Sequence, residues 1–278
     1  GGVVGCSVLY HLTKLGWKDV VLVERSELTS GSTWHAAGGM HTLNSDPNVT
    51  KLQKYTIDLY KEIEEISGQA TGVHLSGGIM AAGTPERLDY LKTMVAKGKY
   101  MGLDIDFISL DEAQRLHPLV DASHFTGAVY DLNEGHVDPS GVTNAYAISA
   151  RKGGAEIYRH TKVEELVAEK DGGWSVVTDK GTIRCEKVVN AGGLWAREIG
   201  RMVGLELPVL AMEHHYLITE ALDEIKALDA ELPHLIDFEA ELYTRQEGQS
   251  FLLGTYEKAC VPWSPHQTPW DFGHELLQ

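Results

Sequence analysis

The sequence has few cysteines, a shortage of basic residues and no long apolar run. Three cysteines occur among 278 residues, and the wide spacing of Cys6, Cys185 and Cys260 predicts reduced thiols rather than a disulfide framework or a clustered zinc site. Acidic residues outnumber basic ones, 40 to 24, for a formal net charge of −16, which argues against binding to nucleic acid or to an anionic membrane. No apolar stretch is long enough to span a bilayer. The composition, 43% hydrophobic, indicates a soluble globular protein of one or two domains.

The first 24 residues contain part of a dinucleotide-binding motif. Residues 1–12 run from glycines into a segment with helical apolar spacing, and Gly16 is expected to end that helix. The run Asp19–Glu24 is then predicted to form a buried parallel strand. Gly2 and Gly5 fit the second and third glycines of G-x-G-x-x-G, where backbone approaches a pyrophosphate and a helix packs on a sheet. Because the first glycine and its preceding strand are missing, the chain is expected to be a fragment that begins inside the motif.

Glu24 supports this interpretation, because an acid about 20 residues after the glycines binds the ribose hydroxyls in such sites. A glycine-rich loop in an unrelated α/β protein is the alternative, since a partial motif is a weak signal. The motif does not distinguish nicotinamide from flavin cofactors, which share the adenosine diphosphate half. The segment GSTWHAAGG at Gly31–Gly39 favours a flavin, because its small residues let backbone lie against a planar ring system and its phosphates, and its amides can bind anions.

Four segments resemble the flavin-dependent dimethylglycine and sarcosine dehydrogenases, a family of amine-oxidising flavoproteins. They are GSTWHAAG at 31–38, EGHVDPSG at 134–141, VVNAGGLWAREIGRMVGL at 188–205 and MEHHYLITE at 212–220. The resemblance covers nearly the whole chain, with the dimethylglycine dehydrogenases nearest. Together with the order of predicted elements, it implies an α/β fold in which a Rossmann-like FAD-binding domain is interleaved with an α+β substrate domain that contains a mostly antiparallel sheet.

The resemblance implies a flavin site in which His35 carries FAD through a covalent bond to the flavin's methyl group. A histidine that only hydrogen-bonds to the flavin or packs near it is the alternative. Val163 aligns with a residue that meets the adenine by its main chain, and Trp195 with an FAD contact, although a core tryptophan at a helix start would look the same. The expected cofactor-binding residues are Gly2, Val3, Val4, Gly5, Glu24, Arg25, Gly31, Ser32, Thr33, Trp34, His35, Ala36, Ala37, Gly38, Gly39, Val163, Gly193 and Trp195.

Two polar residues in the second half are expected to be catalytic: His214, in Met212–Tyr216, and Tyr243, in Glu241–Arg245. In the resembled family a histidine and a tyrosine in matching contexts line the space over the flavin and help to bind and deprotonate the amine. Oxidation of an N-methyl amine needs the neutral nitrogen lone pair, and an imidazole titrating at about pH 6.5 can take the ammonium proton. The alternatives are a strand histidine and a sheet tyrosine without such roles, and His215 is an adjacent candidate.

The sequence gives no role to several other polar residues. Arg245 has a planar fork that suits a substrate carboxylate, but a strand arginine near an acidic loop is more often in a surface ion pair. The histidines considered as metal ligands are His41, His74, His117, His124 and His136. None of them shows a tight ligand spacing with cysteine or acid on one helix, so no metal site is predicted. His41 follows the predicted flavin loop closely enough to approach the isoalloxazine.

Capping signals divide the rest of the chain into helices and strands. The expected helix starts are Asp46-Pro47, Thr84-Pro85, Ser109 with Glu112, and Asp138-Pro139. Strands are expected at Thr161–Leu166 and Lys187–Val189, and Asp171–Gly173 is predicted to turn a hairpin. The order of these elements predicts an FAD-binding domain at 1–45 and 138–205 and a substrate domain at 46–137 and 206–278.

The resemblance implies oxidative N-demethylation of a methylated glycine, dimethylglycine or sarcosine, in which a hydride passes from the N-methyl group to FAD and leaves an iminium. Electron-transfer flavoprotein is the implied electron acceptor, and tetrahydrofolate takes part only where a C-terminal folate-binding domain follows. The expected location is the bacterial cytoplasm or the mitochondrial matrix. Three alternatives stay open: an amine oxidase that uses oxygen, a non-catalytic relative of the pyruvate dehydrogenase phosphatase regulatory subunit, and a nicotinamide-dependent dehydrogenase.

Overall fold

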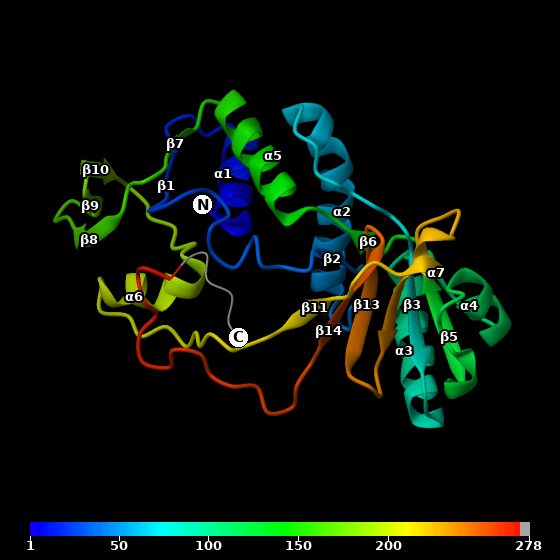
Figure 1. Cartoon of the computed structure of the whole chain (residues 1–278). Coiled ribbons are helices and arrows are strands. Elements are labelled where there is room, and N and C mark those ends of the chain that lie inside the picture. The colour runs from blue at the N-terminus through cyan, green and yellow to red at the C-terminus, as the bar shows by residue number, and fades with distance from the viewer. Residues whose placement is uncertain (273–278) are drawn as a thin grey trace.

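The computed structural model describes residues 1–272 of the chain. Its helices are α1 (Val3–Lys14), α2 (Pro47–Ser67), α3 (Pro85–Tyr100), α4 (Leu110–Leu116), α5 (Pro139–Lys152), α6 (Ala196–Arg201) and α7 (Asp223–Lys226), with 3₁₀ turns η1 (Ala122–His124) and η2 (Gly193–Trp195). Its strands are β1 (Val21–Val23), β2 (Gly39–Met40), β3 (Gly78–Ala82), β4 (Ile105–Ile108), β5 (Gly127–Asp131), β6 (Gly135–His136), β7 (Glu156–Tyr158), β8 (Val163–Ala168), β9 (Trp174–Thr178), β10 (Gly181–Cys185), β11 (Tyr216–Ile218), β12 (His234–Asp237), β13 (Leu242–Glu247) and β14 (Ser250–Thr255). Figure 1 shows α1 and α5 in one part of the molecule, the largest sheet in another, and α2 between them.

The helices α1 and α5 pack side by side, next to a short parallel ladder (Figure 1). In that ladder β1 pairs with β7, so the first strand has the predicted parallel direction, although it is shorter than Asp19–Glu24. Buried residues from three helices form the core of this part, among them Leu9, Tyr146 and Ile63. Cys6 belongs to the same core, and burial raises the pKa of its thiol to about 11. This cysteine therefore stays protonated near neutral pH.

A small antiparallel sheet, in the order β10-β9-β8, is attached to the end of β1. Its hairpin between β8 and β9 turns at Asp171–Gly173 as predicted, and Gly172 has a φ of 89°, which glycine adopts without strain. β8 begins at Val163. Two residues earlier, the Thr161 N–H donates to the carbonyl oxygen of Glu24 at 2.8 Å. This bond fixes the start of β8 beside the end of β1.

The largest sheet has seven strands in the order β11-β14-β13-β12-β3-β5-β4. Within it β12 and β3 pair in parallel, and the other neighbours are antiparallel, which confirms the predicted mostly antiparallel sheet. All five residues of β3 are buried, because helices cover both faces. Met80 packs with Leu91 of α3, whereas its neighbours Ile79 and Ala81 pack with Ala113 of α4, as the alternation of side chains along a strand requires.

Local capping explains where the longer helices begin. Each predicted cap accepts a hydrogen bond from a first-turn N–H, the capping residues being Asp46, Thr84, Ser109 and Asp138. At the other end of α2, Gly68 has the left-handed φ of 75° that is common after a helix. Among residues 1–272, no helix combines the length and the apolar character needed to cross a bilayer.

One predicted strand is wrong. Lys187–Val189 has an irregular backbone, and Val189 is 62% exposed. The β-branched residues favour an extended chain, but a strand also needs a neighbour to pair with its N–H and C=O groups. No strand within residues 1–272 pairs with this segment. The segment still leads into glycines and the turn η2, as predicted.

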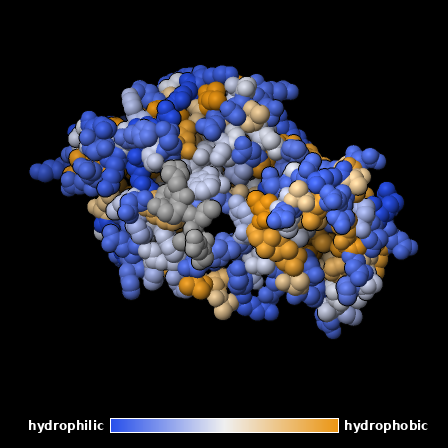
Figure 2. Space-filling view, viewed as in Figure 1, coloured by the Kyte–Doolittle hydropathy of each residue, from blue (hydrophilic) through white to orange (hydrophobic). Residues whose placement is uncertain are grey.

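The division of the chain into two domains stays a prediction. The predicted boundaries put α2 in the substrate domain, and in the structure Leu59 and Ile63 of α2 pack with the core of α1 and α5. On the side of the large sheet, Figure 2 shows apolar residues gathered over the area of β11 and β14. β11 lies at the edge of this sheet, where Leu217 and Ile218 are each 53% exposed.

Candidate active site

Glycines at the N-terminal end of α1 let other groups approach the backbone closely. Gly2 caps the helix without a side-chain hydrogen bond, and the first turn holds no acidic residue. Other segments contact this end of the helix: Thr33 Oγ1 accepts the Val3 N–H at 3.0 Å, and Glu24 Oε2 lies 2.8 Å from the Gly1 nitrogen. A Cβ on Gly2 would lie 2.9 Å from Thr33 Oγ1, and one on Gly5 would lie 3.4 Å from the Cβ of Ala191. Gly2 thus allows close packing against the loop, whereas a Cβ at Gly5 would make an ordinary contact.

Glu24 lies at the end of β1 and beside the start of β8. Its N–H donates to Tyr158 O at 2.9 Å and its carbonyl oxygen accepts from Thr161. The carboxylate is 16% exposed, and it accepts the Ser26 N–H at 2.9 Å, which holds the side chain in place. Glu24 and Val163, the two residues expected to meet the adenosine half of a cofactor, therefore lie at adjoining ends of neighbouring segments.

Trp195 forms the centre of a cluster beside the loop 31–39. The residue is 7% exposed, and the guanidinium carbon of Arg25 lies 4.1 Å from its ring centroid. A Cβ on Gly31 would lie 3.3 Å from Trp195 Cζ3. The indole Nε1–H donates to Pro269 O at 2.8 Å. Trp195 therefore joins the end of β1, the start of the loop, the turn η2 and the C-terminal segment.

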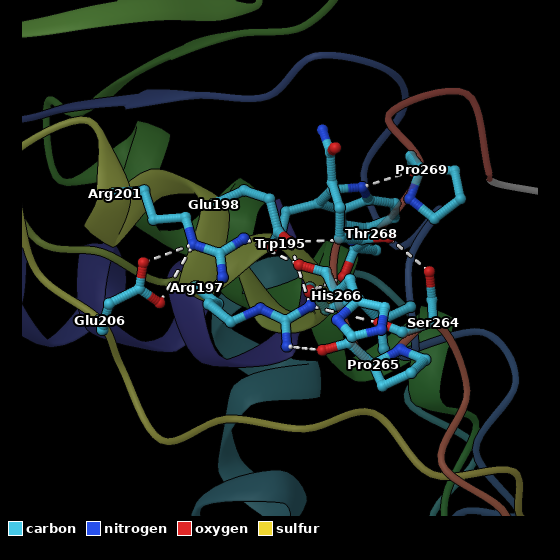
Figure 3. A network of polar contacts seen from close by, with 12 residues as sticks. Trp195, Arg197, Glu198, Arg201, Glu206, Ser264, Pro265, His266, Thr268 and Pro269 are labelled. Atoms are coloured by element: carbon cyan, nitrogen blue, oxygen red, sulfur yellow. Dashed lines mark hydrogen bonds and ion pairs between the residues drawn. The ribbon is translucent and has the colours of Figure 1, made fainter.

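Charged residues of α6 hold the segment Ser264–Pro269 in place (Figure 3). Arg197 donates to two carbonyl oxygens of this segment at 2.8 and 3.2 Å, and Arg201 donates to a third at 2.9 Å. Glu198 Oε1 accepts the Thr268 N–H at 2.8 Å. The side chains of Arg197 and Glu198 are 9% and 4% exposed and pair at 3.3 Å, so neither charge is buried alone. Burial opposes the charge of Glu198, but hydrogen bonds from backbone N–H groups and from Arg197 outweigh it and lower the pKa of the carboxyl.

His35 lies partly buried within the loop. The centroids of the His35 and Trp34 rings are 3.9 Å apart, and the Phe272 ring lies nearly parallel to that of His35 at 6.3 Å. His35 Nδ1 is 3.0 Å from Gly31 O. Because a carbonyl oxygen can only accept, Nδ1 carries a proton, and in the neutral imidazole the lone pair is then on Nε2. Nε2 is therefore the nucleophilic nitrogen of this ring.

The loop ends where Gly38 contacts the backbone next to β6. Gly38 has a φ of 76°, and a Cβ at this position would overlap the carbonyl oxygen of Val137, so only glycine fits. The Gly38 carbonyl oxygen accepts the Val137 N–H at 3.0 Å. Gly39 then pairs with His136 in the antiparallel ladder of β2 and β6. Two of the segments that carry the family resemblance, 31–38 and 134–141, are thus in direct contact.

Arg245 joins the same loop to the large sheet. Its side chain is 8% exposed and pairs with Glu247 at 2.6 Å, and its Nε–H donates to Ala37 O at 2.8 Å. Arg245 thus takes part in an ion pair, but its side chain is buried against the loop and does not lie on the surface. Residues two apart on a strand face the same side, so Tyr243 lies on the face of β13 that is turned toward the loop.

Three rings form a row over β13 and β14. The ring centroids of Tyr243 and Tyr256 are 5.7 Å apart, and those of Tyr256 and His214 are 5.0 Å apart. The Nδ1 atom of His214 lies 3.5 Å from Glu257 Oε2. The structure thus brings His214 and Tyr243 together through Tyr256, a residue to which the sequence gave no role.

Gly254 makes room for the Tyr243 ring. The two residues are opposite one another in the β13–β14 ladder, and a Cβ on Gly254 would overlap the tyrosine ring. Burial raises the pKa of Tyr243, and the neighbouring Tyr256 and Tyr216 act in the same direction. Tyr243 therefore remains a phenol, a hydrogen-bond donor, through the neutral pH range.

The whole chain matches the family model described as FAD dependent oxidoreductase, over residues 1–278. The chain belongs to this family. It is 41% identical over 283 residues to dimethylglycine dehydrogenase, mitochondrial, of Homo sapiens, which covers 100% of this chain and 33% of that protein. It is 35% identical over 279 residues to sarcosine dehydrogenase, mitochondrial, of Homo sapiens, with 98% and 30% covered. The chain thus spans about a third of the length of these relatives.

A solved structure of the same fold is the L-proline dehydrogenase from P. horikoshii, with a TM-score of 0.81 and 26% identity over 91% of this chain and 67% of that chain. The predicted α/β fold and the resemblance to dimethylglycine and sarcosine dehydrogenases are both confirmed. The residues at the site also fit the FAD of the family name. The glycine-lined N-terminal end of α1, with no acidic residue in its first turn, suits a pyrophosphate, and Glu24 suits ribose hydroxyls. Which of the expected residues contact FAD stays a prediction.

The sequence did not reveal the residues that hold the site together over long distances. Arg197, Glu198 and Thr268 fix Trp195 and its turn, and Arg245 fixes the loop. The Arg-Glu pair two residues after the tryptophan is visible in the sequence. Its partners lie some 70 positions away, and no local pattern identifies them.

Four histidines from separate segments form a second row, next to Gly39. The ring centroids are 4.8 Å apart for His74 and His136, 5.5 Å for His136 and His234, and 6.3 Å for His234 and His41. Burial is the main cause that lowers the pKa of His136, and it lowers the pKa of His234 to about 3. Local spacing in the sequence does not reveal this row, because its members meet only in the fold.

Proposed function

We propose that this chain forms the flavin-binding and amine-oxidising part of an enzyme that demethylates a methylated glycine, dimethylglycine or sarcosine. The bond from Arg245 to Ala37 O carries this proposal. It joins the loop of His35 to the strand of Tyr243, and so puts the expected attachment point of a flavin and an expected catalytic residue on the same side of the sheet. The identities to the dimethylglycine and sarcosine dehydrogenases support the substrate class.

When FAD is bound, it accepts the hydride from the N-methyl carbon, and the amine becomes an iminium. The residues of this chain hold the cofactor's parts at separate places. The N-terminal end of α1 would bind the pyrophosphate, Glu24 the ribose, and the backbone of Gly31–Gly39 the ring system. We propose His35 as the residue that carries FAD covalently, through Nε2, because Nδ1 is occupied by Gly31 O.

His214 and Tyr243 prepare the substrate nitrogen. A methylated glycine is an ammonium at neutral pH, and hydride can leave its methyl group only after the nitrogen has lost a proton. His214 takes this proton at an imidazole nitrogen, with Glu257 near enough to stabilise the resulting charge. Tyr243 is not assigned as the base, because burial raises its pKa and keeps the hydroxyl protonated at neutral pH. Its hydroxyl instead donates a hydrogen bond that orients the amine or its carboxylate.

The fate of the product and the electrons depends on partners. Water hydrolyses the iminium to formaldehyde and the demethylated amine, or tetrahydrofolate captures the carbon where a folate-binding domain is present. Electron-transfer flavoprotein is the proposed acceptor, and molecular oxygen is the alternative. The names of the two relatives place them in mitochondria, which supports a location in the mitochondrial matrix, and the bacterial cytoplasm is the alternative.

Substrate bleaching of the flavin absorbance tests the proposed reaction. The full-length holoenzyme is mixed anaerobically with dimethylglycine, sarcosine or glycine betaine, and the absorbance of oxidised flavin is followed. Dimethylglycine or sarcosine should bleach the flavin. Glycine betaine is the matched control, because its nitrogen has no proton to lose and no lone pair. Bleaching by betaine at a similar rate would contradict the proposed role of the lone pair, and no bleaching by any of the three would contradict the reaction.

A second measurement tests His35. The full-length protein is precipitated with acid and digested, and the peptide that contains His35 is examined by mass spectrometry for the added mass of FAD. Finding that mass on His35 supports the covalent link. Flavin found only in the supernatant would contradict the covalent link to His35 but not the proposed reaction. A protein without any flavin would favour the non-catalytic alternative.

A further inference from the structure

Two histidines are fixed side by side at one end of the histidine row. His74 and His136 exchange both backbone hydrogen bonds, at 2.8 and 2.9 Å, in an isolated antiparallel bridge. Residues directly opposite in such a bridge project their side chains to the same side. The two rings are accordingly stacked, with centroids 4.8 Å apart and planes 11° apart. Gly135 permits this approach, because a Cβ there would overlap the carbonyl oxygen of His74.

A carboxylate faces both rings. Glu231 Oε2 is 2.8 Å from His74 Nδ1, and its other oxygen is 3.5 Å from His136 Nε2. Glu231 lies in the loop before β12, and the next residue holds this loop in place. Leu232 is buried, with 3% exposure, and its N–H donates to Gln246 Oε1 at 3.0 Å. The carboxylate therefore approaches the histidines from an anchored backbone.

The donor atoms of these three residues are spaced like the ligands of one metal ion. One nitrogen or oxygen from each of His74, His136 and Glu231 lies within 4.8 Å of the others. Bonds of about 2.0–2.1 Å in a tetrahedral zinc site separate the ligand atoms by roughly 3.3 Å, a value between the shortest and longest of these separations. Small rotations of the exposed His74 and Glu231 side chains can bring the atoms to that distance.

We propose that His74, His136 and Glu231 bind one divalent transition-metal ion, of which zinc is the best match, with the fourth position open to water. Two imidazoles and one carboxylate form the ligand set of three-ligand zinc sites. Imidazole nitrogens favour zinc, nickel and copper over magnesium and calcium, which prefer oxygen ligands. Among the described residues, this group is the one in which three such donors converge.

A buried neighbour supports the central ligand. His136 Nδ1 lies 3.3 Å from His234 Nε2, and the two ring planes are 13° apart. With Nε2 of His136 turned to the metal, its Nδ1–H donates to His234, the kind of outer contact that orients metal-ligating histidines. His234 is 4% exposed and cannot swing away. The nearby positive charge of Arg245 is neutralised by its pair with Glu247.

The site adjoins the predicted flavin loop but does not depend on it. His136 pairs with Gly39 in the β2–β6 ladder, so the metal ligand and the end of the loop are on neighbouring strands. Zinc binding is measured directly, as metal bound per chain, and not through the rate of amine oxidation. The proposal thus stands or falls separately from the proposed reaction.

Equilibrium dialysis tests the proposal. The full-length, tag-free holoenzyme is dialysed against buffered free zinc, and the zinc bound per chain is measured by elemental (inductively coupled plasma) mass spectrometry. The variants His74→Ala and Glu231→Gln change partly exposed side chains, which keeps the fold intact, as circular dichroism verifies. We expect one zinc per wild-type chain and an affinity lowered at least about tenfold in each variant. Magnesium at the same concentration should not compete.

His124→Ala is the matched control. His124 Nε2 lies 3.3 Å from Asp121 Oδ2 on the surface, so it is a histidine with a carboxylate but without a second imidazole. Its replacement should leave zinc binding unchanged. Equal zinc binding in wild type, His74→Ala and Glu231→Gln would overturn the proposal, as would a wild-type protein that binds none. X-ray absorption at the zinc edge should show two imidazole ligands, and a shell without imidazole would also overturn it.

Discussion

The Nε–H of Arg245 and the carbonyl oxygen of Ala37 form a hydrogen bond of 2.8 Å between residues 208 positions apart. The bond connects a strand of the large sheet to the glycine-rich loop that is expected to contact the flavin. Both the guanidinium and the loop are held by further contacts, Arg245 by Glu247 and the loop by Val137. The relative position of His35 and Tyr243 therefore depends on this arginine.

Replacement of Arg245 by lysine should loosen the loop. Lysine keeps the charge but has no planar fork that reaches Ala37, Gln246 and Glu247 at once. We expect the free energy of unfolding in urea to fall by about 2 kcal/mol, the usual contribution of a hydrogen bond to a charged group. The holoenzyme should also retain less flavin after gel filtration.

Arg184→Lys is the control for this prediction. Arg184 pairs with Asp171 on the surface, and both side chains are 61% exposed. Its replacement should change the free energy of unfolding by less than about 0.5 kcal/mol. A loss of stability in Arg184→Lys that equals the loss in Arg245→Lys would show that the bond to the loop is unimportant.

Gly254→Ala should displace the Tyr243 ring without unfolding the sheet. The backbone of Gly254 does not have a positive φ, so alanine fits the strand, but its methyl group would overlap the tyrosine ring. We expect the rate of flavin reduction by the substrate to fall by on the order of 100-fold, as misplacement of a catalytic group by about 1 Å can cause. The thermal unfolding midpoint should be nearly unchanged.

The double variant Gly254→Ala with Tyr243→Phe shows whether this loss acts through the tyrosine. If it does, the two changes are not additive, and the double variant should be little slower than Tyr243→Phe alone. Additive losses would mean that Gly254 affects the reaction by another route.

The ionisation of Tyr243 should not appear in the pH dependence near neutrality. Burial raises its pKa above the ordinary value of 10.0, so the hydroxyl is protonated at every pH below that value. The ratio of flavin-reduction rates in Tyr243→Phe and wild type should therefore be constant from roughly pH 6 to 9. A ratio that changes tenfold for each pH unit in this range would identify Tyr243 as a base and contradict its role as a donor.

Trp195→Phe should weaken the attachment of the C-terminal segment. Phenylalanine fills most of the same space but lacks the N–H that donates to Pro269 O. We expect a loss of about 1 kcal/mol in the free energy of unfolding, together with faster cleavage by a protease within Ser264–Pro269. Trp17→Phe is a suitable comparison, because Trp17 is 51% exposed and should tolerate the change. Equal protease sensitivity in both variants would contradict the role of the indole N–H.

Local signals predicted the fold where the deciding contacts are local. The helix start at Asp46 depends on N–H groups two and three residues away, and the end at Gly68 depends on its own φ. The glycines of the dinucleotide motif are recognisable in the sequence by their spacing, although the atom that Gly2 approaches, Thr33 Oγ1, is 31 residues away. Such requirements can be read in the sequence without knowledge of the rest of the fold.

Long-range contacts set the limit of that prediction. Lys187–Val189 has the composition of a strand but no neighbour in the described part of the chain. An arginine on a strand is typical of the protein surface, yet Arg245 is buried because the loop covers it. The His74–His136 pair is formed by a two-residue bridge that has no sequence pattern of its own. In each case the partner is distant in the chain, and the residue alone does not identify it.

The contacts between α6 and Ser264–Pro269 set an order of events during protein synthesis. The ribosome makes Trp195 about 70 residues before the carbonyl group that receives its N–H, and the partners of Arg197 and Glu198 arrive equally late. At translation rates of about 5–20 residues per second, several seconds separate the two halves of this contact. The nascent chain therefore has its glycine-rich motif long before Trp195 is fixed beside it. FAD that enters before residue 269 has left the ribosome meets an unfinished site, so cofactor loading should follow the synthesis of this segment rather than precede it.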